Sequence, residues 1–237
     1  MPPVELVLAA TAGAPAALDL GPGSIALVLL AGFAAVGGGG VIQLPALLLI
    51  PGIAPVQALA TNKLGSLIGT VTSAITYLRR THPDLRTAVP MALFALVGAA
   101  IGASFAASLP AAVFTPIIVI ALIAVAVFTA ARPSLGAVTR LRYSGAGHLA
   151  RALGLGLVIG AYDGLLGPGT GTFLVISLVS VIGYDFLRAS ATAKIVNVAT
   201  NIGALALFIP HGAVLWGLGL ALGVANMVGA YLGARVA

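Results

Sequence analysis

The chain has 237 residues, of which 60% are apolar and 7% are Asp, Glu, Lys or Arg. Because a soluble domain carries about 25% charged residues, this composition excludes a water-soluble globular protein. The absence of Cys excludes disulfide frameworks, thiolate nucleophiles and zinc–thiolate sites. Residues 20–62, 87–131 and 195–234 carry no Asp, Glu, Lys or Arg. Each run can hold two bilayer crossings, since one crossing takes about 20 residues.

The net charge of +6 comes mainly from arginines at the edges of the apolar stretches or in segment 132–151. This placement is typical of the cytoplasmic loops of membrane proteins. No interleaved aromatic residues accompany them to stack on bases, so we expect no nucleic-acid partner. The arginines are Arg79, Arg80, Arg86, Arg132, Arg140, Arg142, Arg151, Arg188 and Arg235.

The first half of the chain predicts a tail, a broken hairpin and three full helices. Residues 1–23 contain four prolines, two acids and no basic residue, so we expect an extracytoplasmic tail. The run Gly37–Gly40 divides the next apolar stretch into half-helices at 24–36 and 41–50. Neither half-helix is long enough to cross a bilayer alone. Full helices are expected at 55–79, 85–108 and 110–131.

The same pattern starts again after a linker at 132–147, which we expect to be cytoplasmic. Gly167–Gly171 breaks the first apolar stretch of this second half. We expect a first repeat at 24–131 and a second at 148–237, without a final helix to match 110–131. The helices predicted in the second half span 148–166, a short segment that ends at 182, 185–209 and 213–235.

Two motifs recur at a constant spacing of 131 residues, which indicates a duplication. Ala-x-Ala-Thr-x-Lys occurs at 58–63 and at 189–194, and the two lysines of the chain are the last residues of these motifs. Gly-Ala-x-x-Gly-Ala occurs at 98–103 and at 229–234. Small residues at this spacing favour close helix packing.

The arginines also decide the topology. If each broken segment is a hairpin that enters and leaves on one side, all nine arginines lie on one face. If each is a single crossing, Arg188 and Arg235 lie outside. The hairpin count follows the positive-inside rule and leaves three crossings per half, an odd number that inverts the second copy. We therefore expect an all-α integral membrane protein with an inverted repeat, each half a re-entrant (broken) helical hairpin plus two or three transmembrane helices. Many secondary transporters share this plan.

Lys63 and Lys194 lie eight and nine residues into their predicted helices. At 1.5 Å per residue both are roughly 12 to 14 Å deep, near the middle of a hydrocarbon core about 30 Å thick. An ammonium there costs at least about 2.5–3.5 kcal/mol, so it is expected to face a cavity, a partner or a ligand. Polar residues follow each lysine on the same helix face, namely Ser66 and Thr70 after Lys63 and Asn197 and Asn201 after Lys194.

The two glycine-rich breaks complete a predicted anion site. The half-helices that begin near Val41 and Thr172 would present free N–H groups and a positive dipole end near the midplane. The two lysines would supply charge, the breaks backbone donors, and the hydroxyl and amide side chains orientation. The predicted substrate-binding residues are Lys63, Lys194, Gly38, Gly39, Gly40, Val41, Ser66, Thr70, Gly169, Thr170, Gly171, Thr172, Asn197 and Asn201.

Other readings of these polar residues stay open at this point. The lysines can instead snorkel, or pair with Asp163 and hold the bundle together. Asp163 lies deep in an apolar segment and has Gly32 as its repeat mate. It is either a coupling group for H⁺ or Na⁺ or a counter-charge for Lys194. We expect Gln43 and Asn226 to make helix–helix hydrogen bonds, and Asp185 to cap a helix.

The residue inventory does not support an enzyme. The histidines at 82, 148 and 211 are far apart, so neither a metal cluster nor a serine–histidine dyad is indicated. The glycine-rich break lacks the Gly-Lys-Ser/Thr ending of a phosphate loop, and one deep carboxyl is too few for an intramembrane aspartyl protease. We therefore expect no catalytic residue, no metal and no cofactor.

Several of these motifs together resemble the sulfite exporter TauE/SafE family, in its branch of 4-toluene sulfonate uptake permeases and probable membrane transporters. They are the glycine run with Pro45 after it, Ala-x-Ala-Thr-Asn-Lys at 58–63, Tyr77 with Arg79-Arg80, Tyr-Asp-Gly-Leu-Leu-Gly-Pro-Gly-Thr-Gly-Thr at 162–172, and Ala-Thr-Ala-Lys at 191–194. The resemblance runs from about residue 24 to the end of the chain. It implies a multi-pass permease of the bacterial inner membrane for sulfite or small organosulfonates.

The residues and the resemblance lead to one functional hypothesis and two alternatives. The hypothesis is a secondary transporter that binds a small oxyanion at the midplane and alternates its access, with H⁺ or Na⁺ as the coupling ion. Its partners would be the anionic substrate and the lipid bilayer. The alternatives are a passive anion channel and a structural membrane protein that transports nothing.

Overall fold

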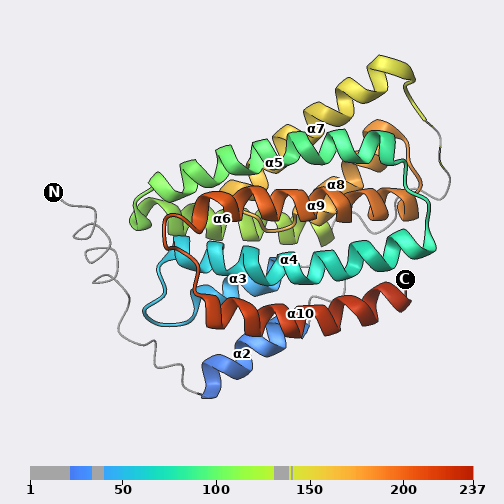
Figure 1. Cartoon of the computed structure of the whole chain (residues 1–237). Helices are drawn as coiled ribbons and strands as arrows, with labels where there is room; N and C mark the ends of the chain where they lie inside the picture. Colours follow the sequence, from blue (N-terminus) through green and yellow to red (C-terminus); the bar gives the residue numbers. More distant parts are fainter. Residues whose placement is uncertain (1–21, 34–39, 131–138, 140, 237) are drawn as a thin grey trace, which may run out of the picture.

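The computed structural model describes residues 22–33, 40–130, 139 and 141–236 (Figure 1). Over these residues the chain forms nine α-helices and one π-helical turn, and it contains no strand. The elements are α2 (Pro22–Phe33), α3 (Gly40–Leu48), α4 (Pro55–Arg80), α5 (Leu85–Ser108), α6 (Ala111–Ala130), α7 (Gly145–Leu165), α8 (Thr170–Ser177), the π-turn η2 (Leu178–Ile182), α9 (Phe186–Phe208) and α10 (Trp216–Val236).

The apolar stretches predicted the helices closely. α5 has the predicted bounds. α4 ends one residue later than predicted, and α9 begins one residue later and ends one residue earlier. α2 begins at Pro22, inside the predicted tail, and is described as far as Phe33, so the predicted end at residue 36 lies outside the described residues. α7 begins three residues earlier than expected because Ser144 already has the extended conformation of a residue that precedes a helix. Residues 1–21 of the predicted tail, 131–138 and 140 of the linker region, and 34–39 around the first break lie outside the described residues.

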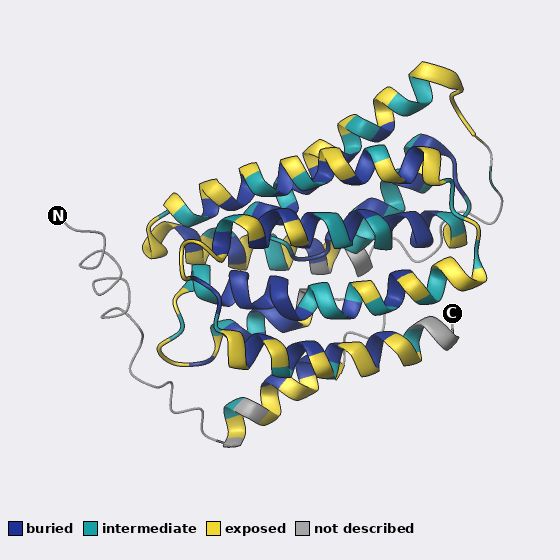
Figure 2. Ribbon diagram, viewed as in Figure 1, coloured by how far each residue is buried: buried dark blue, intermediate teal, exposed yellow. Residues whose placement is uncertain are grey.

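The burial pattern of α5 is that of a helix in a membrane bundle, with large apolar side chains outside and mainly small ones inside. On α5, every fourth residue from Val89 to Phe105 is an exposed Val, Leu, Ile or Phe, while alanines face the interior (Figure 2). Lipid tails are as apolar as these exposed side chains, so small residues gather where helices pack. The exposed residues are Val89, Leu93, Val97, Ile101 and Phe105.

Three described helices are long and apolar enough to cross a membrane by length and composition. They are α5, α9 and α10 as far as Gly233. We predicted five full helices, of which α4 falls outside this set although it has 26 residues; α7, one leg of the predicted second hairpin, falls outside it with 21 residues. Their composition is more polar because they carry Lys63 and Asp163 with their polar neighbours. α6 counts as a shorter apolar helix over Ala111–Val125.

Glycines on both sides bring α5 and α7 into backbone contact. A Cβ on Gly102 would lie 2.0 Å from the carbonyl oxygen of Ala161, and a Cβ on Gly164 would lie 2.0 Å from that of Ala99. Such distances leave room for hydrogen alone. The expected small-residue face of α5 is therefore confirmed, and its partner is a matching face on α7. These glycines are Gly98 and Gly102 on α5, and Gly156, Gly160 and Gly164 on α7.

The segment α7–α8–η2 forms a hairpin that starts and ends at the same end of the bundle. The backbone N–H of Arg142, just before α7, donates to the carbonyl oxygen of Ile182, the last residue of η2 (3.2 Å). Gly167 and Gly169 turn the chain at the opposite tip with φ of 88° and 73°. α4 and α9, which are 131 residues apart in sequence, pack side by side and run in opposite directions (Figure 1).

Two aspartates accept hydrogen bonds from the first turns of α5 and α9 and so cap the starts of these helices. The expected cap is confirmed, since Asp185 Oδ1 accepts from the backbone N–H of Arg188 (2.8 Å). Asp84 accepts from the N–H of Arg86 (3.1 Å) and from the hydroxyl of Thr87 (2.8 Å). Burial raises the pKa of Asp84, but these hydrogen bonds outweigh burial and hold the pKa below its ordinary value. Tyr184 also donates to Asp84 (3.3 Å), which ties the end of η2 to the start of α5.

The glycine contact between α5 and α7 predicts the effect of adding one methyl group. In Gly160→Ala the Cβ would lie 2.3 Å from the carbonyl oxygen of Ala95 and 2.8 Å from its Cα. Since these are backbone atoms, the helices must separate, and we expect a loss of about 1–3 kcal/mol in unfolding free energy. Thermal unfolding in detergent measures it. Gly154→Ala on the same helix is the control, because its Cβ meets nothing within 4 Å. Equal melting temperatures for both variants would contradict this packing.

Candidate functional site

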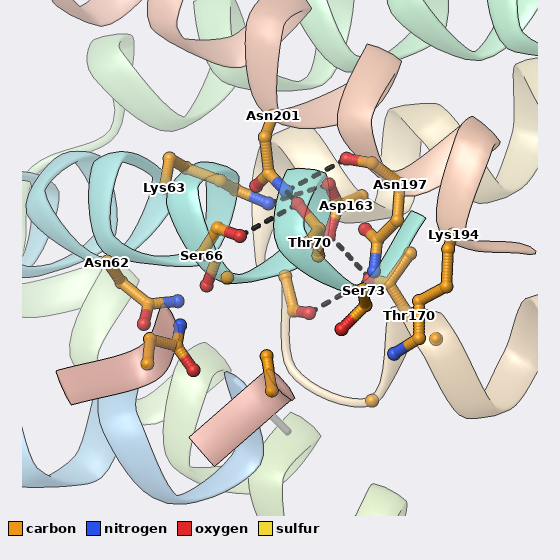
Figure 3. A pocket seen from close by; sticks show the side chains of 16 residues that line it. Asn62, Lys63, Ser66, Thr70, Ser73, Asp163, Thr170, Lys194, Asn197 and Asn201 are labelled. Atoms are coloured by element: carbon orange, nitrogen blue, oxygen red, sulfur yellow. Dashed lines mark hydrogen bonds and ion pairs between the residues drawn. The ribbon is translucent and has the colours of Figure 1, made fainter. Parts of the chain in front are cut away.

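Polar side chains from α4, α7, α9 and α10 and the turn before α8 converge on a cavity inside the bundle (Figure 3). The cavity has a volume of about 40 Å³. A single water needs about 10–15 Å³, so there is room for a few waters or a small ion. The lining residues are Asn62, Lys63, Ser66, Gly69, Thr70, Ser73, Asp163, Gly167, Gly169, Thr170, Gly171, Lys194, Asn197, Asn201, Asn226 and Ala230.

The structure brings nine of the fourteen predicted substrate-binding residues to this cavity. Thr172 lies in α8 but does not belong to the lining. Gly38 and Gly39 lie outside the described residues, and Gly40 and Val41 form the start of α3, where only the backbone is described. The nine residues are Lys63, Ser66, Thr70, Gly169, Thr170, Gly171, Lys194, Asn197 and Asn201. Their role in binding stays a prediction.

Lys63 and Asp163 form a buried ion pair in the cavity wall. The distance from Lys63 Nζ to Asp163 Oδ2 is 2.8 Å, and the two side chains are 2% and 3% exposed. The alternative that a lysine pairs with Asp163 is therefore confirmed for Lys63. The alternative that Asp163 is the counter-charge of Lys194 is wrong, because the carboxylate pairs with Lys63. The pair joins α4 to α7, so it links the two halves of the sequence.

The turn between α7 and α8 shapes the carboxylate end of this pair. A Cβ on Gly167 would lie 3.0 Å from Lys63 Nζ, so glycine leaves space for the ammonium. Gly169 has a left-handed φ, and a Cβ there would lie 2.3 Å from Val125 Cγ1 of α6. Thr170, the first residue of α8, donates its hydroxyl to Asp163 Oδ1 (2.6 Å). The same hydroxyl lies 2.8 Å from the carbonyl oxygen of Gly167.

Lys194 has no counter-charge among the described residues. Its side chain is partly buried and lines the cavity from α9, and Figure 3 shows its ammonium directed away from Asp163. The charged groups of the lining are the two lysines and Asp163, which sum to +1 when all are ionised. A positive charge that is held inside an apolar bundle without a partner favours a bound anion.

Amide and hydroxyl groups of α4 and α9 meet next to the charges. Asn201 Nδ2 donates to the backbone oxygen of Asn197 (2.8 Å) and lies 3.5 Å from the hydroxyl oxygen of Thr70. Thr70 and Asn201 are repeat mates, 131 residues apart. The expected helix–helix hydrogen bonds are also confirmed, since Gln43 Oε1 accepts from the hydroxyl of Ser66 (3.3 Å). Asn226 Nδ2 donates to the backbone oxygen of Gly65 (3.0 Å).

Sequence reasoning missed four polar or glycine residues of the lining on α4 and α10. Ser73 extends the spacing of Lys63, Ser66 and Thr70 by one more helical step, so continuing the pattern would have found it. Asn62 was passed over as the neighbour of Lys63, and its Oδ1 is buried without a hydrogen-bond partner among the described residues. Gly69 gave no chemical signal. Asn226 was expected only to join helices.

Comparison with known proteins identifies a family and several relatives of the chain. The family model described as Sulfite exporter TauE/SafE matches residues 24–237. A "Probable membrane transporter protein ORF9" of Sinorhizobium sp is 41% identical over 201 residues, which cover 85% of this chain and 76% of the relative.

Two further relatives match with similar coverage. A "Probable membrane transporter protein" of Haemophilus influenzae is 31% identical over 225 residues, with 92% and 87% coverage of this chain and the relative. "Probable membrane transporter protein YfcA" of Escherichia coli K12 is 35% identical over 212 residues, with 89% and 78% coverage. No solved structure matches the chain.

The ion pair predicts that the two lysines differ in their effect on stability. Lys63→Met leaves the Asp163 carboxylate buried without its partner, so we expect a loss of about 3–5 kcal/mol in unfolding free energy. Lys194→Met removes a charge that has no counter-charge among the described residues, so it should preserve or raise stability. Thermal unfolding of both variants in detergent compares two chemically identical changes at repeat-related positions. Equal losses would show that the Lys63–Asp163 pair does not stabilise the fold.

Proposed function

The chain belongs to the sulfite exporter TauE/SafE family, and we propose that it is a secondary transporter for small sulfur-containing oxyanions such as sulfite and organosulfonates. It is a multi-pass membrane protein of a transporter family and not an enzyme. The observation that carries the proposal is the cavity between α4, α7, α9 and α10, whose lining has an excess positive charge and several hydrogen-bond donors.

The donor set fits an oxyanion better than a cation or an apolar solute. Lys194 offers an ammonium that has no carboxylate partner in the described part of the chain, and amide or hydroxyl groups of Ser73, Asn197 and Asn201 lie around the same space. Thr170, Gly171 and the following residues begin α8, so backbone N–H groups and a positive dipole end lie at the cavity wall. Sulfite and sulfonates carry several oxygens that accept charge-assisted hydrogen bonds.

We place this site at the contact between two inverted repeats, residues 24–131 and 148–237, that move against each other to alternate access. The opposite course of α4 and α9 supports this plan, as does the contact between the mates Thr70 and Asn201. The α7–α8–η2 segment would be a re-entrant hairpin, since both of its ends lie together.

The proposed location is the bacterial inner membrane with the arginine-rich loops in the cytoplasm. The end of α4 and the starts of α5, α7 and α9 lie at one end of the bundle (Figure 1). Arg79, Arg80, Arg86, Arg151 and Arg188 belong to these segments. Their gathering at one end supports the orientation given by the positive-inside rule.

Asp163 is the candidate for the group that binds the coupling ion, H⁺ or Na⁺. It is an acid in the cavity lining and forms an ion pair with Lys63. When H⁺ or Na⁺ binds the carboxylate, Asp163 no longer neutralises Lys63, and the charge of Lys63 is then available to an anion. In the other half of the chain the repeat mate is Gly32, so the coupling group would belong to one repeat only.

Reconstituted liposomes test the proposal through the two lysines. We expect Lys63→Ala and Lys194→Ala each to lower the rate of anion uptake by about tenfold or more, because each loses a charge-assisted hydrogen bond to the substrate. Thr115→Ala on the outer face of α6 is the control for reconstitution, since Thr115 bonds only its own helix. If the anion flux is unchanged in both lysine variants, the two lysines do not bind the substrate as proposed.

A binding assay separates a carrier from the alternatives. Sulfite, thiosulfate, sulfoacetate and taurine should include at least one anion that raises the melting temperature of the wild-type protein, because a ligand stabilises the state it binds. A structural membrane protein would show no shift with any of them. A passive channel would conduct every one of these anions without saturation and without coupling to a proton or sodium gradient.

A further inference from the structure

The hydroxyl of Thr170 has two acceptors but one proton. It lies 2.6 Å from Asp163 Oδ1 and 2.8 Å from the carbonyl oxygen of Gly167. A hydroxyl group donates one hydrogen bond and accepts up to two. Asp163 Oδ1 and the Gly167 oxygen therefore compete for the same proton as long as both are acceptors.

This geometry gives the Asp163 carboxyl group hydrogen-bond partners in either protonation state. When the carboxyl is ionised, Thr170 donates to Oδ1 and Lys63 pairs with Oδ2. When Oδ1 carries a proton, it can donate to the Thr170 oxygen, whose own proton then turns to the Gly167 oxygen. No buried donor loses its partner in this change, so protonation avoids the cost of an unsatisfied polar group.

Protonation of Asp163 also changes the charge of the cavity and the role of Lys63. With both lysines protonated and Asp163 ionised, the lining carries +1. A neutral Asp163 no longer holds Lys63 by charge, and the lining then carries +2. Since uncompensated charge is costly inside a low-dielectric interior, the occupied cavity is most stable when its total charge is zero.

Among the described residues, the titratable groups around Asp163 are the two lysines already counted in the cavity charge and Tyr162. Lys63 faces it from α4, and Lys194 of α9 lines the same cavity. Tyr162 of its own helix donates its hydroxyl to the carbonyl oxygen of Pro168 (2.6 Å). On α5 the sole ionisable residue is Arg86 in the first turn, and α8 and η2 contain none.

We propose that Asp163 takes up one proton when the cavity binds a divalent oxyanion and stays ionised when the cavity binds a monovalent one. This inference rests on the proposed function and specifies its coupling ion as H⁺. For a divalent anion, the anion and one proton enter, Lys63 leaves the carboxylate for the anion, and Asp163 becomes the neutral acid. The two lysines then balance the two negative charges. For a monovalent anion, Lys194 alone supplies the balancing charge.

One consequence concerns the charge that crosses the membrane. A divalent anion with its proton carries a net charge of −1, and so does a monovalent anion without a proton. The same transporter therefore moves the same charge per cycle with either class of substrate. A proton gradient drives the divalent class alone.

Two probe anions test the proposal on the purified wild-type protein. Thiosulfate carries two negative charges and methanesulfonate one, and neither changes its charge between about pH 5 and about pH 8, so any pH dependence belongs to the protein. The dissociation constant for thiosulfate should rise about tenfold per pH unit, the slope for uptake of one proton. The constant for methanesulfonate should stay within about twofold. Equal slopes for the two anions would overturn the proposal.

Proton uptake provides a second readout that does not depend on any variant. In weakly buffered solution, saturation of the wild-type protein with thiosulfate should take up about one proton per protein, and saturation with methanesulfonate none. If thiosulfate binds without proton uptake at neutral pH, Asp163 is not the proton acceptor. The blank is the detergent solution without protein, to which each salt is added in the same way.

Variants then assign the proton to Asp163. Asp163→Asn should bind thiosulfate with a constant that no longer depends on pH, and the proton uptake should vanish. Thr170→Ser should keep the wild-type pH profile, whereas Thr170→Val, which lacks both hydrogen-bonded arrangements, should shift it by about one pH unit. An unchanged slope in a folded Asp163→Asn protein would contradict the assignment. If neither anion binds the wild-type protein at any pH, it is the proposed function that fails.

Discussion

The Lys63–Asp163 ion pair is the interaction on which the interior of the bundle depends. Two charges within an apolar assembly are tolerated because they lie 2.8 Å apart and because Thr170 supplies a further hydrogen bond. The turn after α7 is built around them, with glycines at 167 and 169 where side chains would strike Lys63 and Val125. The cavity exists because this turn and α4 approach each other through polar groups and not through close packing.

The two partners of the pair belong to parts of the bundle that are packed in different ways. Asp163 is carried by α7, which contacts α5 along a row of glycines with backbone atoms touching. Lys63 is carried by α4, whose contacts with α9 near the cavity run through Thr70, Asn197 and Asn201. Close backbone packing resists sliding, whereas hydrogen bonds between side chains can be exchanged for bonds to a ligand or water. α9 is itself packed on α5, since a Cβ on Gly203 would lie 2.3 Å from the backbone oxygen of Leu96. A displacement of α4 relative to α9 would therefore cost less than a separation of α5 from α7 or from α9.

The sequence predicted the helices and most of the cavity, but not the pairing within it. Uncharged apolar runs and glycine breaks define helices such as α5 to the residue, because bilayer-scale length and turn chemistry are local properties. Helical spacing and the 131-residue repeat placed Lys63, Thr70, Lys194 and Asn201 together. They did not show which lysine Asp163 meets, because that depends on how α7 rotates against α5, which the glycine contacts fix. The π-turn η2 likewise left no signal in the apolar run 170–182.

The repeat is broken at the one position where a second carboxylate would make the site symmetric. Gly32 is the mate of Asp163, and a Cβ there would lie 2.8 Å from the Cβ of Ala225 and 3.1 Å from the backbone oxygen of Leu222. No aspartate fits in that contact, so Lys194 has no carboxylate from the equivalent position. Two lysines with the same chemistry thus have different surroundings. Lys63 is paired with the Asp163 carboxylate, whereas Lys194 is available to a substrate anion. A second carboxylate would bring the lining charge to zero and remove the attraction for any anion, so the close packing at Gly32 preserves the positive charge on which binding depends.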